Sequence, residues 1–186
     1  MQIPNSERLK FHFMTAADEE LFFQLDQDPE VMKYITRGRT MTRDDIENWY
    51  IPRLNKYANQ LRGWGLWGMT RLDNDKYIGW ILVRPMHFFE PELRDDDDLE
   101  LGWRLFRDEW GKGYATEGAN AVMESLRANE ACSRFSALAI KENTGSTRVM
   151  QKLGMEFVKE ELYVDPDPVL DDELCVLYSC PAHVAD

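Results

Sequence analysis

Cysteine is scarce in this sequence, and long apolar runs are missing. The three cysteines are odd in number and lack the spacing of a zinc site, which argues against a disulfide framework and a cysteine-bound metal. Such a chain suits a reducing compartment, so we expect a cytoplasmic protein. No apolar run approaches the roughly 20 residues of a membrane-spanning helix, and Met1 to Ser6 lack the parts of a secretory signal. We therefore expect no membrane partner.

Basic residues are also in deficit. Lysine and arginine number 22 against 34 acidic residues, so the formal net charge is −12 and the pI is near 4.7. A nucleic-acid partner would require a basic surface and is not expected. An acidic surface suits a cationic substrate such as an amine, although high net charge also simply keeps a protein soluble. His12, His87 and His183 show neither metal nor triad spacing, so we expect no metal.

Three common enzyme motifs are absent. The Walker phosphate loop fails because Lys112 is followed by Gly113 rather than by serine or threonine, and the dinucleotide loop fails because Thr116 stands where a third glycine is needed. These gaps disfavour a nucleotide triphosphatase and a Rossmann dehydrogenase. A Gly-x-Ser-x-Gly nucleophile elbow is also missing, so we expect no acyl-enzyme on a serine of that type.

The stretch from Trp110 to Glu117 contains two glycines between an expected strand and an expected helix. Gly111 and Gly113 allow a tight turn and leave backbone N–H groups uncovered. Those N–H groups would lie at a helix N-terminus, where the macrodipole favours an anion. The arrangement can cradle a pyrophosphate. A plain strand-to-helix connection is the alternative, because short glycine motifs are common in turns.

A second helix start follows one strand later. Asn143 is a good N-cap, Ser146 falls in the first turn, and Gly154 stands where a C-cap residue belongs. Together with the glycine stretch, this segment gives a strand, helix, strand, helix, strand order. That rhythm is typical of a parallel α/β sheet.

The chain as a whole reads as one domain over residues 1–186, with a core of about 6–180. We expect the first helix to be interrupted at Asp28–Pro29 and a second helix, capped by Thr42, to be kinked or split at Pro52. Strands 64–72 and 77–84 should form an antiparallel hairpin. The remaining expected elements are strands 8–14, 99–106, 133–140, 157–163 and 174–179, and helices 16–27 and 115–128.

The glycine stretch resembles the acyl-CoA-binding loop of the GNAT N-acetyltransferase superfamily, Gln/Arg-x-x-Gly-x-Gly/Ala. Gly113 and Ala115 fall on its last two fixed positions, whereas Trp110 departs from the first. Trp-Gly-x-Gly-Tyr-Ala-Thr-Glu is the form typical of the ribosomal-protein-alanine N-acetyltransferase branch. Residues 7–11, 99–105 and 143–155 resemble further motifs of that branch in the same order. Four ordered motifs are more specific than one glycine loop.

The resemblance implies an α/β (α+β) fold. Its central mixed, mostly antiparallel sheet has about seven strands with flanking helices, and acyl-CoA lies in the cleft between splayed central strands. It also implies direct transfer of acetyl from acetyl-CoA to a primary amine, on a protein N-terminus or a small molecule. An inactive acyl-CoA-binding module, acting as a sensor or partner protein, is the alternative, and a nucleotide-binding protein is a third. Met150 favours inactivity, because many family members place a tyrosine there and methionine cannot donate a proton.

Two residues are candidates for catalysis. Glu100 is expected to act as the base, through water, on the strand that the resemblance places beside the reaction. Alternatively it faces solvent or pairs with Arg104. Ser146 is expected to support the leaving thiolate or position the cofactor, unless its hydroxyl only bonds its own backbone. Tyr163 is a distant substitute as proton donor.

The cofactor contacts are expected mainly from backbone groups. Leu105 and Phe106 would offer theirs to the pantetheine arm, as the resemblance implies. Lys112 either lies near a phosphate or is an exposed loop residue, and Glu117 is expected to be structural. The full expected set for acetyl-CoA is Leu105, Phe106, Gly111, Lys112, Gly113, Tyr114, Ala115, Thr116 and Asn143.

The acceptor side is less defined. Most tryptophans on strands should be core, but Trp67 or Trp103 could line the acceptor pocket. Tyr34 falls in a region that shapes acceptor choice in the family. The run Asp95–Asp98 is expected to be a solvated loop, with a weak cation site or attraction of a cationic acceptor as alternatives. The identity of the amine stays open, and so does a homodimer.

Overall fold

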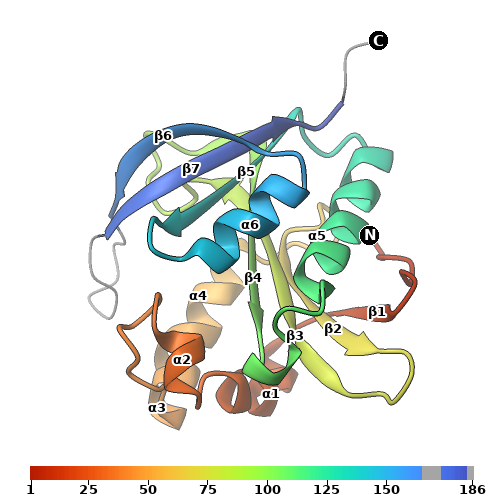
Figure 1. Ribbon diagram of the computed structural model, residues 1–186, viewed down its shortest axis with the longest axis vertical. Coiled ribbons are helices and arrows are strands. Elements are labelled where there is room, and N and C mark those ends of the chain that lie inside the picture. Colours follow the sequence, from red (N-terminus) through yellow and green to blue (C-terminus); the bar gives the residue numbers. More distant parts are fainter. Residues whose placement is uncertain (165–172, 184–186) are drawn as a thin grey trace.

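A seven-stranded sheet organises the molecule, in the order β1-β2-β3-β4-β5-β7-β6. The computed structural model describes residues 1–164 and 173–183 (Figure 1). Its strands are β1 (Leu9–Phe13), β2 (Gly65–Arg71), β3 (Tyr77–Met86), β4 (Asp95–Leu105), β5 (Arg134–Ile140), β6 (Glu156–Tyr163) and β7 (Glu173–Pro181). Its α-helices are α1 (Glu19–Leu25), α2 (Pro29–Met32), α3 (Arg43–Asp45), α4 (Ile51–Tyr57), α5 (Tyr114–Ala128) and α6 (Thr144–Lys152). The expected mixed sheet with flanking helices is confirmed.

Among the strands that the structure describes, only β4 and β5 pair in parallel. Every other neighbouring pair in the sheet is antiparallel. The parallel sheet that the strand-helix rhythm predicts is therefore wrong for most strand pairs. After β6 the chain does not continue the crossover pattern, and β7 lies between β5 and β6. The mostly antiparallel sheet implied by the resemblance is correct.

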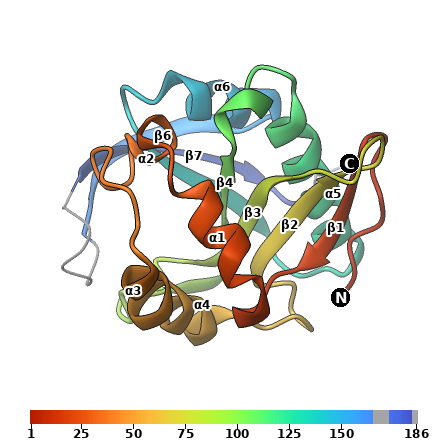
Figure 2. The ribbon, with the colours of Figure 1, turned by 90° about the horizontal axis from the view of Figure 1, so that it is seen from below.

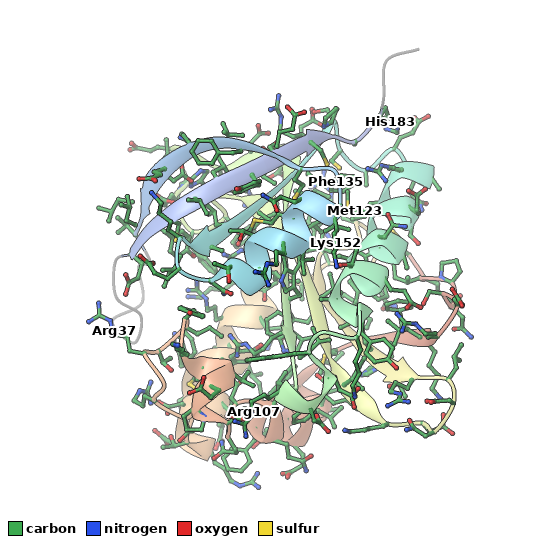
Figure 3. The ribbon with its side chains drawn as sticks, viewed as in Figure 1. Arg37, Arg107, Met123, Phe135, Lys152 and His183 are labelled. Carbon is green, nitrogen blue, oxygen red and sulfur yellow. The ribbon has the colours of Figure 1, made fainter. Side chains whose placement is uncertain are left out.

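The two faces of the sheet are covered by different helices. Helices α5 and α6 lie on one face and α1, α3 and α4 on the other (Figure 2). Along β4, Leu99, Leu101 and Leu105 belong to the core cluster beneath α5. Met123 of α5 and Phe135 of β5, labelled in Figure 3, belong to the same cluster. A second cluster under α1 to α4 contains residues such as Phe22 and Trp80. Alternation along a strand thus sorts residues between two cores.

The first helical region breaks where the sequence predicts. Asp28 accepts a hydrogen bond from the N–H of Glu30 and caps α2, with Pro29 in the first turn. Thr42 forms a capping box at the start of α3. A π-helical turn then runs from Ile46 to Tyr50 before α4, which carries Pro52 in its first turn. Proline cannot donate a backbone hydrogen bond, so the expected split at Pro52 takes the form of this wider turn.

The aspartate run is a strand and not the expected loop. Its side chains are exposed from Asp95 to Asp97, but its backbone forms the first part of β4. Ser133 donates its N–H to the Asp97 carbonyl at 3.0 Å, and the Ser136 hydroxyl donates to Asp98 at 2.8 Å. Pairing with a neighbouring strand outweighs the low strand propensity of aspartate.

Within residues 1–164 and 173–183, no helix is long and apolar enough to cross a bilayer.

Candidate active site

The sheet opens in its middle, between β4 and β5. The two strands pair only from Asp98 to Glu100, opposite Arg134 to Ser136, although β4 continues to Leu105. Phe106 donates its N–H to the carbonyl of Ile78 on the other side, at 3.1 Å. Because backbone groups alternate in an antiparallel ladder, those of Trp103 and Leu105 point toward the opening. Beyond Glu100, β4 therefore offers backbone groups to whatever enters between the strands.

The two residues expected to contact the pantetheine arm differ. Leu105 lies on the opening, where its carbonyl accepts a hydrogen bond from the Trp110 indole at 2.9 Å. Phe106 does not fit the expectation. Its N–H bonds Ile78, and its carbonyl accepts from the N–H of Glu109 at 3.0 Å. Both backbone groups of Phe106 are used within the protein, so we remove it from the cofactor set.

The glycine loop forms a cradle of free N–H groups at the start of α5. Gly111 and Gly113 have φ angles of 72° and 85°, the left-handed region that favours glycine, and Gly113 is the N-cap. The N–H groups of Tyr114, Ala115 and Thr116 precede the first intrahelical bond, which Glu117 makes to the Gly113 carbonyl. No acceptor from residues 1–164 or 173–183 takes them. This end of a 15-residue helix suits an anion.

Charged residues brace the loop from behind. Lys112 pairs with Glu109 at 3.0 Å, and Lys76 pairs with the same carboxylate at 2.8 Å. Burial would raise the pKa of Glu109, but the hydrogen bonds from both lysines hold it below its ordinary value. The Lys112 side chain is thus exposed, at 45 %, but its ammonium is paired beside the loop.

Glu117 has the structural role that the sequence predicts. Its carboxylate accepts hydrogen bonds from the Ser6 hydroxyl at 2.7 Å and from the Arg8 N–H at 2.8 Å. The Arg8 guanidinium adds a bond to Glu117 at 2.6 Å and one to the Lys112 carbonyl at 3.1 Å. Burial opposes these contacts, yet they keep the pKa of Glu117 below its usual range. The loop and β1 are therefore held together.

Glu100 lies where β4 and β5 separate, on the face of α1 to α4. It forms a two-bond ion pair with Arg84 of β3, at 2.6 and 3.0 Å, and both side chains are buried. Burial would lower the pKa of Arg84, but the Glu100 carboxylate raises it well above its ordinary value. Arg84 also donates to the Tyr163 hydroxyl at 3.2 Å. The expected alternative pairing with Arg104 is wrong, because Arg104 binds Asp26 instead, at 2.7 Å.

Ser146 lies on the opposite face, in the first turn of α6. Its N–H donates to the Asn143 side chain at 3.2 Å, so Asn143 is the N-cap as predicted. Its hydroxyl oxygen accepts a hydrogen bond from the Trp103 indole at 3.2 Å. Tyr34 reaches the same turn, where its hydroxyl donates to the Glu142 carbonyl at 3.3 Å. The structure brings Trp103, Ser146, Asn143 and Tyr34 together.

Trp67 does not join this group. Its residue is 2 % exposed, its indole donates to the Gly63 carbonyl at 2.9 Å, and its ring packs edge-on against Phe13. A side chain enclosed in the core cannot line an acceptor pocket, so we correct that expectation. Trp64 and Trp80 are also buried, as predicted for strand tryptophans.

The comparison with protein families decides the assignment. A family model described as an acetyltransferase (GNAT) domain matches residues 8–156. The chain belongs to the GNAT acetyltransferase family. Its enzyme class is therefore that of the acetyl-CoA-dependent N-acetyltransferases.

Individual relatives agree with the GNAT assignment. The FsC-acetyl coenzyme A-N(2)-transacetylase of Aspergillus fumigatus is 28 % identical over 159 residues, which are 82 % of this chain and 65 % of that protein. The chain thus spans about two thirds of the length of this curated relative. A GNAT acetyltransferase structure from Bacillus anthracis superposes with a TM-score of 0.75 at 25 % identity, covering 98 % of this chain and 99 % of that one. A ribosomal L7/L12 α-N-protein acetyltransferase bound to coenzyme A shares the fold, with a TM-score of 0.73 at 12 % identity. The superposition covers 97 % of this chain and 98 % of that one.

The sequence does not predict the surroundings of Glu100, and it offers Tyr163 only as a distant substitute proton donor. Arg84 bonds Glu100 directly, and Tyr163 is linked to Glu100 through Arg84. The rings of Tyr57 and Phe89 lie near the Arg84 guanidinium, with centres 5.9 and 5.3 Å from its carbon. The pairing of β3 with β4 sets Arg84 opposite Glu100. The sequence would predict that register only if the conformation of the connection between β3 and β4 were known. The sequence predicts strands over 157–163 and 174–179, but it does not predict the pairing of β6 with β7 that brings Tyr163 close.

Proposed function

We propose that this GNAT chain transfers the acetyl group of acetyl-CoA directly to a primary amine, on a protein N-terminus or a small molecule. The observation that carries the proposal is the position of the two candidate catalytic groups. Glu100 and Ser146 lie on opposite faces of the sheet, at the opening between β4 and β5. An amine can approach from one face and the thioester from the other.

The cofactor side has the chemistry that acetyl-CoA requires. The N–H groups of Tyr114, Ala115 and Thr116 would hold the pyrophosphate, with Gly111 and Gly113 letting it approach. A Cβ added at Gly111 would meet open space, so the approach to the loop is clear. The backbone of Leu105, on the edge of β4 that faces the opening, would contact the pantetheine arm together with Asn143.

The acceptor side has the chemistry for a cationic substrate. An amine arrives as an ammonium and must lose a proton before its nitrogen attacks the carbonyl carbon. Glu100 would take that proton through water, and its two hydrogen bonds from Arg84 fix the direction of its carboxylate. Tyr34 and the aromatic rings near Arg84 would contact the body of the acceptor. No residue need carry the acetyl group covalently.

An inactive acyl-CoA-binding module is the competing function. Met150, in the place of a tyrosine, is 1 % exposed and packs in the core, so it takes no part in the site. The opening between β4 and β5 keeps two polar side chains, Glu100 and Ser146, that acetyl transfer can use. The relatives described above are acetyltransferases and give no support to inactivity.

The test is acetyl-CoA consumption, followed as free thiol, across a panel of amines and N-terminal peptides. Turnover that falls in both Glu100→Gln and Ser146→Ala supports the proposal and identifies the acceptor class. Tight CoA binding by calorimetry without turnover on any amine favours the inactive module. A third result, no CoA binding at all, refutes both.

We further propose a cytoplasmic site of action and a homodimer. Cys132, Cys175 and Cys180 are free and buried, which fits a reducing compartment. At the β6 edge of the sheet, Phe157 and Leu162 are 54 and 61 % exposed, so a second copy could cover them. Sedimentation of the wild type and of Leu162→Asp would test the dimer. A monomer in both cases would refute it.

A further inference from the structure

One hydrogen bond joins β4 to α6 across the opening of the sheet. The Trp103 indole Nε1 lies 3.2 Å from the Ser146 hydroxyl oxygen. The Trp103 backbone faces the opening, and its ring packs against the core cluster beneath α5. Ser146 stands in the first turn of α6, with its N–H fixed by Asn143. Both partners are therefore held in place, Trp103 by packing and Ser146 by the helix cap.

The chemistry of the two groups determines the direction of this bond. An indole N–H can only donate, so the Ser146 oxygen must accept. A hydroxyl carries one hydrogen and two lone pairs, and this contact uses one lone pair. Among residues 1–164 and 173–183, no acceptor takes the Ser146 hydrogen. The hydroxyl is left as an unused donor beside the opening.

We propose that Trp103 is a positioning residue that keeps the Ser146 hydroxyl as a hydrogen-bond donor to the sulfur of the departing CoA thiolate. This inference rests on the proposed acetyl transfer and assigns Trp103 a role other than lining the acceptor pocket. By accepting from the indole, the Ser146 oxygen becomes a stronger donor, because hydrogen bonds in a chain polarise one another. The N-terminal end of α6 adds positive potential to the same place.

The step that benefits is the collapse of the tetrahedral intermediate. The bond between the acceptor nitrogen and the carbonyl carbon has formed, the carbon–sulfur bond breaks, and its electron pair goes to sulfur. The Ser146 hydroxyl donates a hydrogen bond to that sulfur and keeps its own proton. The proton released by the amine goes to Glu100 through water and then to solvent or to the free thiolate. Neither Trp103 nor Ser146 is changed at the end of the cycle.

The experiment measures kcat and KM for acetyl-CoA in wild type, Trp103→Phe, Ser146→Ala and the double variant. Phenylalanine keeps the apolar packing and removes only the N–H and part of the ring. We expect kcat to fall roughly three- to tenfold in Trp103→Phe, the effect of one net hydrogen bond, with KM changed less than twofold. In the Ser146→Ala background, Trp103→Phe should have no further effect on kcat, because the group that it positions is gone.

The matched control is Trp67→Phe. That indole also donates one hydrogen bond, of 2.9 Å to the Gly63 carbonyl, and its ring also packs in the core beneath α5. The substitution should lower the melting temperature and leave kcat unchanged. A loss of kcat equal to that of Trp103→Phe would show that general loosening of the core explains both.

A second measurement does not depend on turnover. In 15N-labelled protein, the Trp103 indole resonance is identified by its loss in Trp103→Phe. This resonance should differ between Ser146→Ala and wild type, both without CoA and after CoA is added. An unmoved resonance overturns the hydrogen bond. Equal effects of Trp103→Phe on kcat with and without Ser146, or an effect on KM alone, overturn the positioning role. An inactive wild type would instead refute the proposed function.

Discussion

The two sides of the opening between β4 and β5 are built in different ways. The proposed cofactor side would use backbone groups of one continuous stretch, from Gly111 to Thr116, and the helix that follows. The proposed acceptor side would use side chains from separate strands, with Glu100 of β4, Arg84 of β3 and Tyr163 of β6 in one chain of contacts. A site made of backbone groups can keep its ligand when many of its side chains change. A side-chain site can change its substrate by changing single residues.

The largest effect should come from Glu100→Gln on the acceptor side. Loss of the base should lower kcat by roughly 100-fold or more, measured by free-thiol release with a good acceptor. The matched control is Asp26→Asn, which breaks the other buried arginine pair of β4, with Arg104. Each variant leaves a buried guanidinium unpaired and should lose about 3–5 kcal/mol of stability. A similar fall of kcat in both variants would assign the effect of Glu100 to folding.

The next effect should appear on the cofactor side, with Gly111→Ala. An alanine at a φ of 72° is strained by about 1–2 kcal/mol, so the loop would relax and misalign its N–H groups. CoA affinity, measured by calorimetry, should fall about five- to tenfold. Gly154→Ala is the control, because this glycine has a φ of 79° and open space around its Cα, but ends α6 away from the cradle. Equal loss of affinity in both variants would contradict the assignment of the loop.

Glu109→Gln removes the charge that tethers Lys112, and its expected effect is on stability rather than on turnover or CoA affinity. The pKa of Glu109 is below its ordinary value of 4.5 in the folded protein. Its stabilising contribution is therefore complete above pH 4.5 and disappears as the pH falls through the lower folded pKa. Relative to wild type, Glu109→Gln should lose about 1–3 kcal/mol at pH 7 and much less near pH 3, measured by urea unfolding. A pH-independent difference would rule out the ionic contribution.

The smallest effect is expected from neutralising the exposed aspartates Asp95, Asp96 and Asp97 to asparagine. Asp96 is four residues from Glu100 on an extended strand, about 13 Å away, and beyond the Debye length of about 8 Å at physiological salt. Asp96 is also paired with Arg62 and Arg94. The acceptor KM should therefore change less than twofold at physiological ionic strength. A severalfold increase would support the attraction of a cationic acceptor that the sequence suggests.

Features that depend on one continuous stretch of chain could be predicted from the sequence, whereas contacts between separate strands could not. The cradle at Gly111 and Gly113 and the cap at Asn143 are local devices, and both are where the sequence places them. The partner of Glu100 is not local. It depends on the register between β3 and β4, whereas the sequence offers Arg104 only as one alternative partner. The aspartate run was expected to be a loop because its composition is that of a loop, but hydrogen bonds to Ser133 and Ser136 draw it into the sheet.

The contacts of Glu117 have a consequence for how the protein can be handled. Ser6 lies 111 positions earlier in the sequence, yet it and Arg8 hold the carboxylate that begins the cofactor-side helix, and Arg8 also holds the Lys112 carbonyl. The N-terminal segment thus braces the proposed cofactor loop from outside. Trimming these residues, or fusing a bulky partner directly before them, would loosen the glycine cradle from outside. An affinity tag belongs at a distance from this end of the chain.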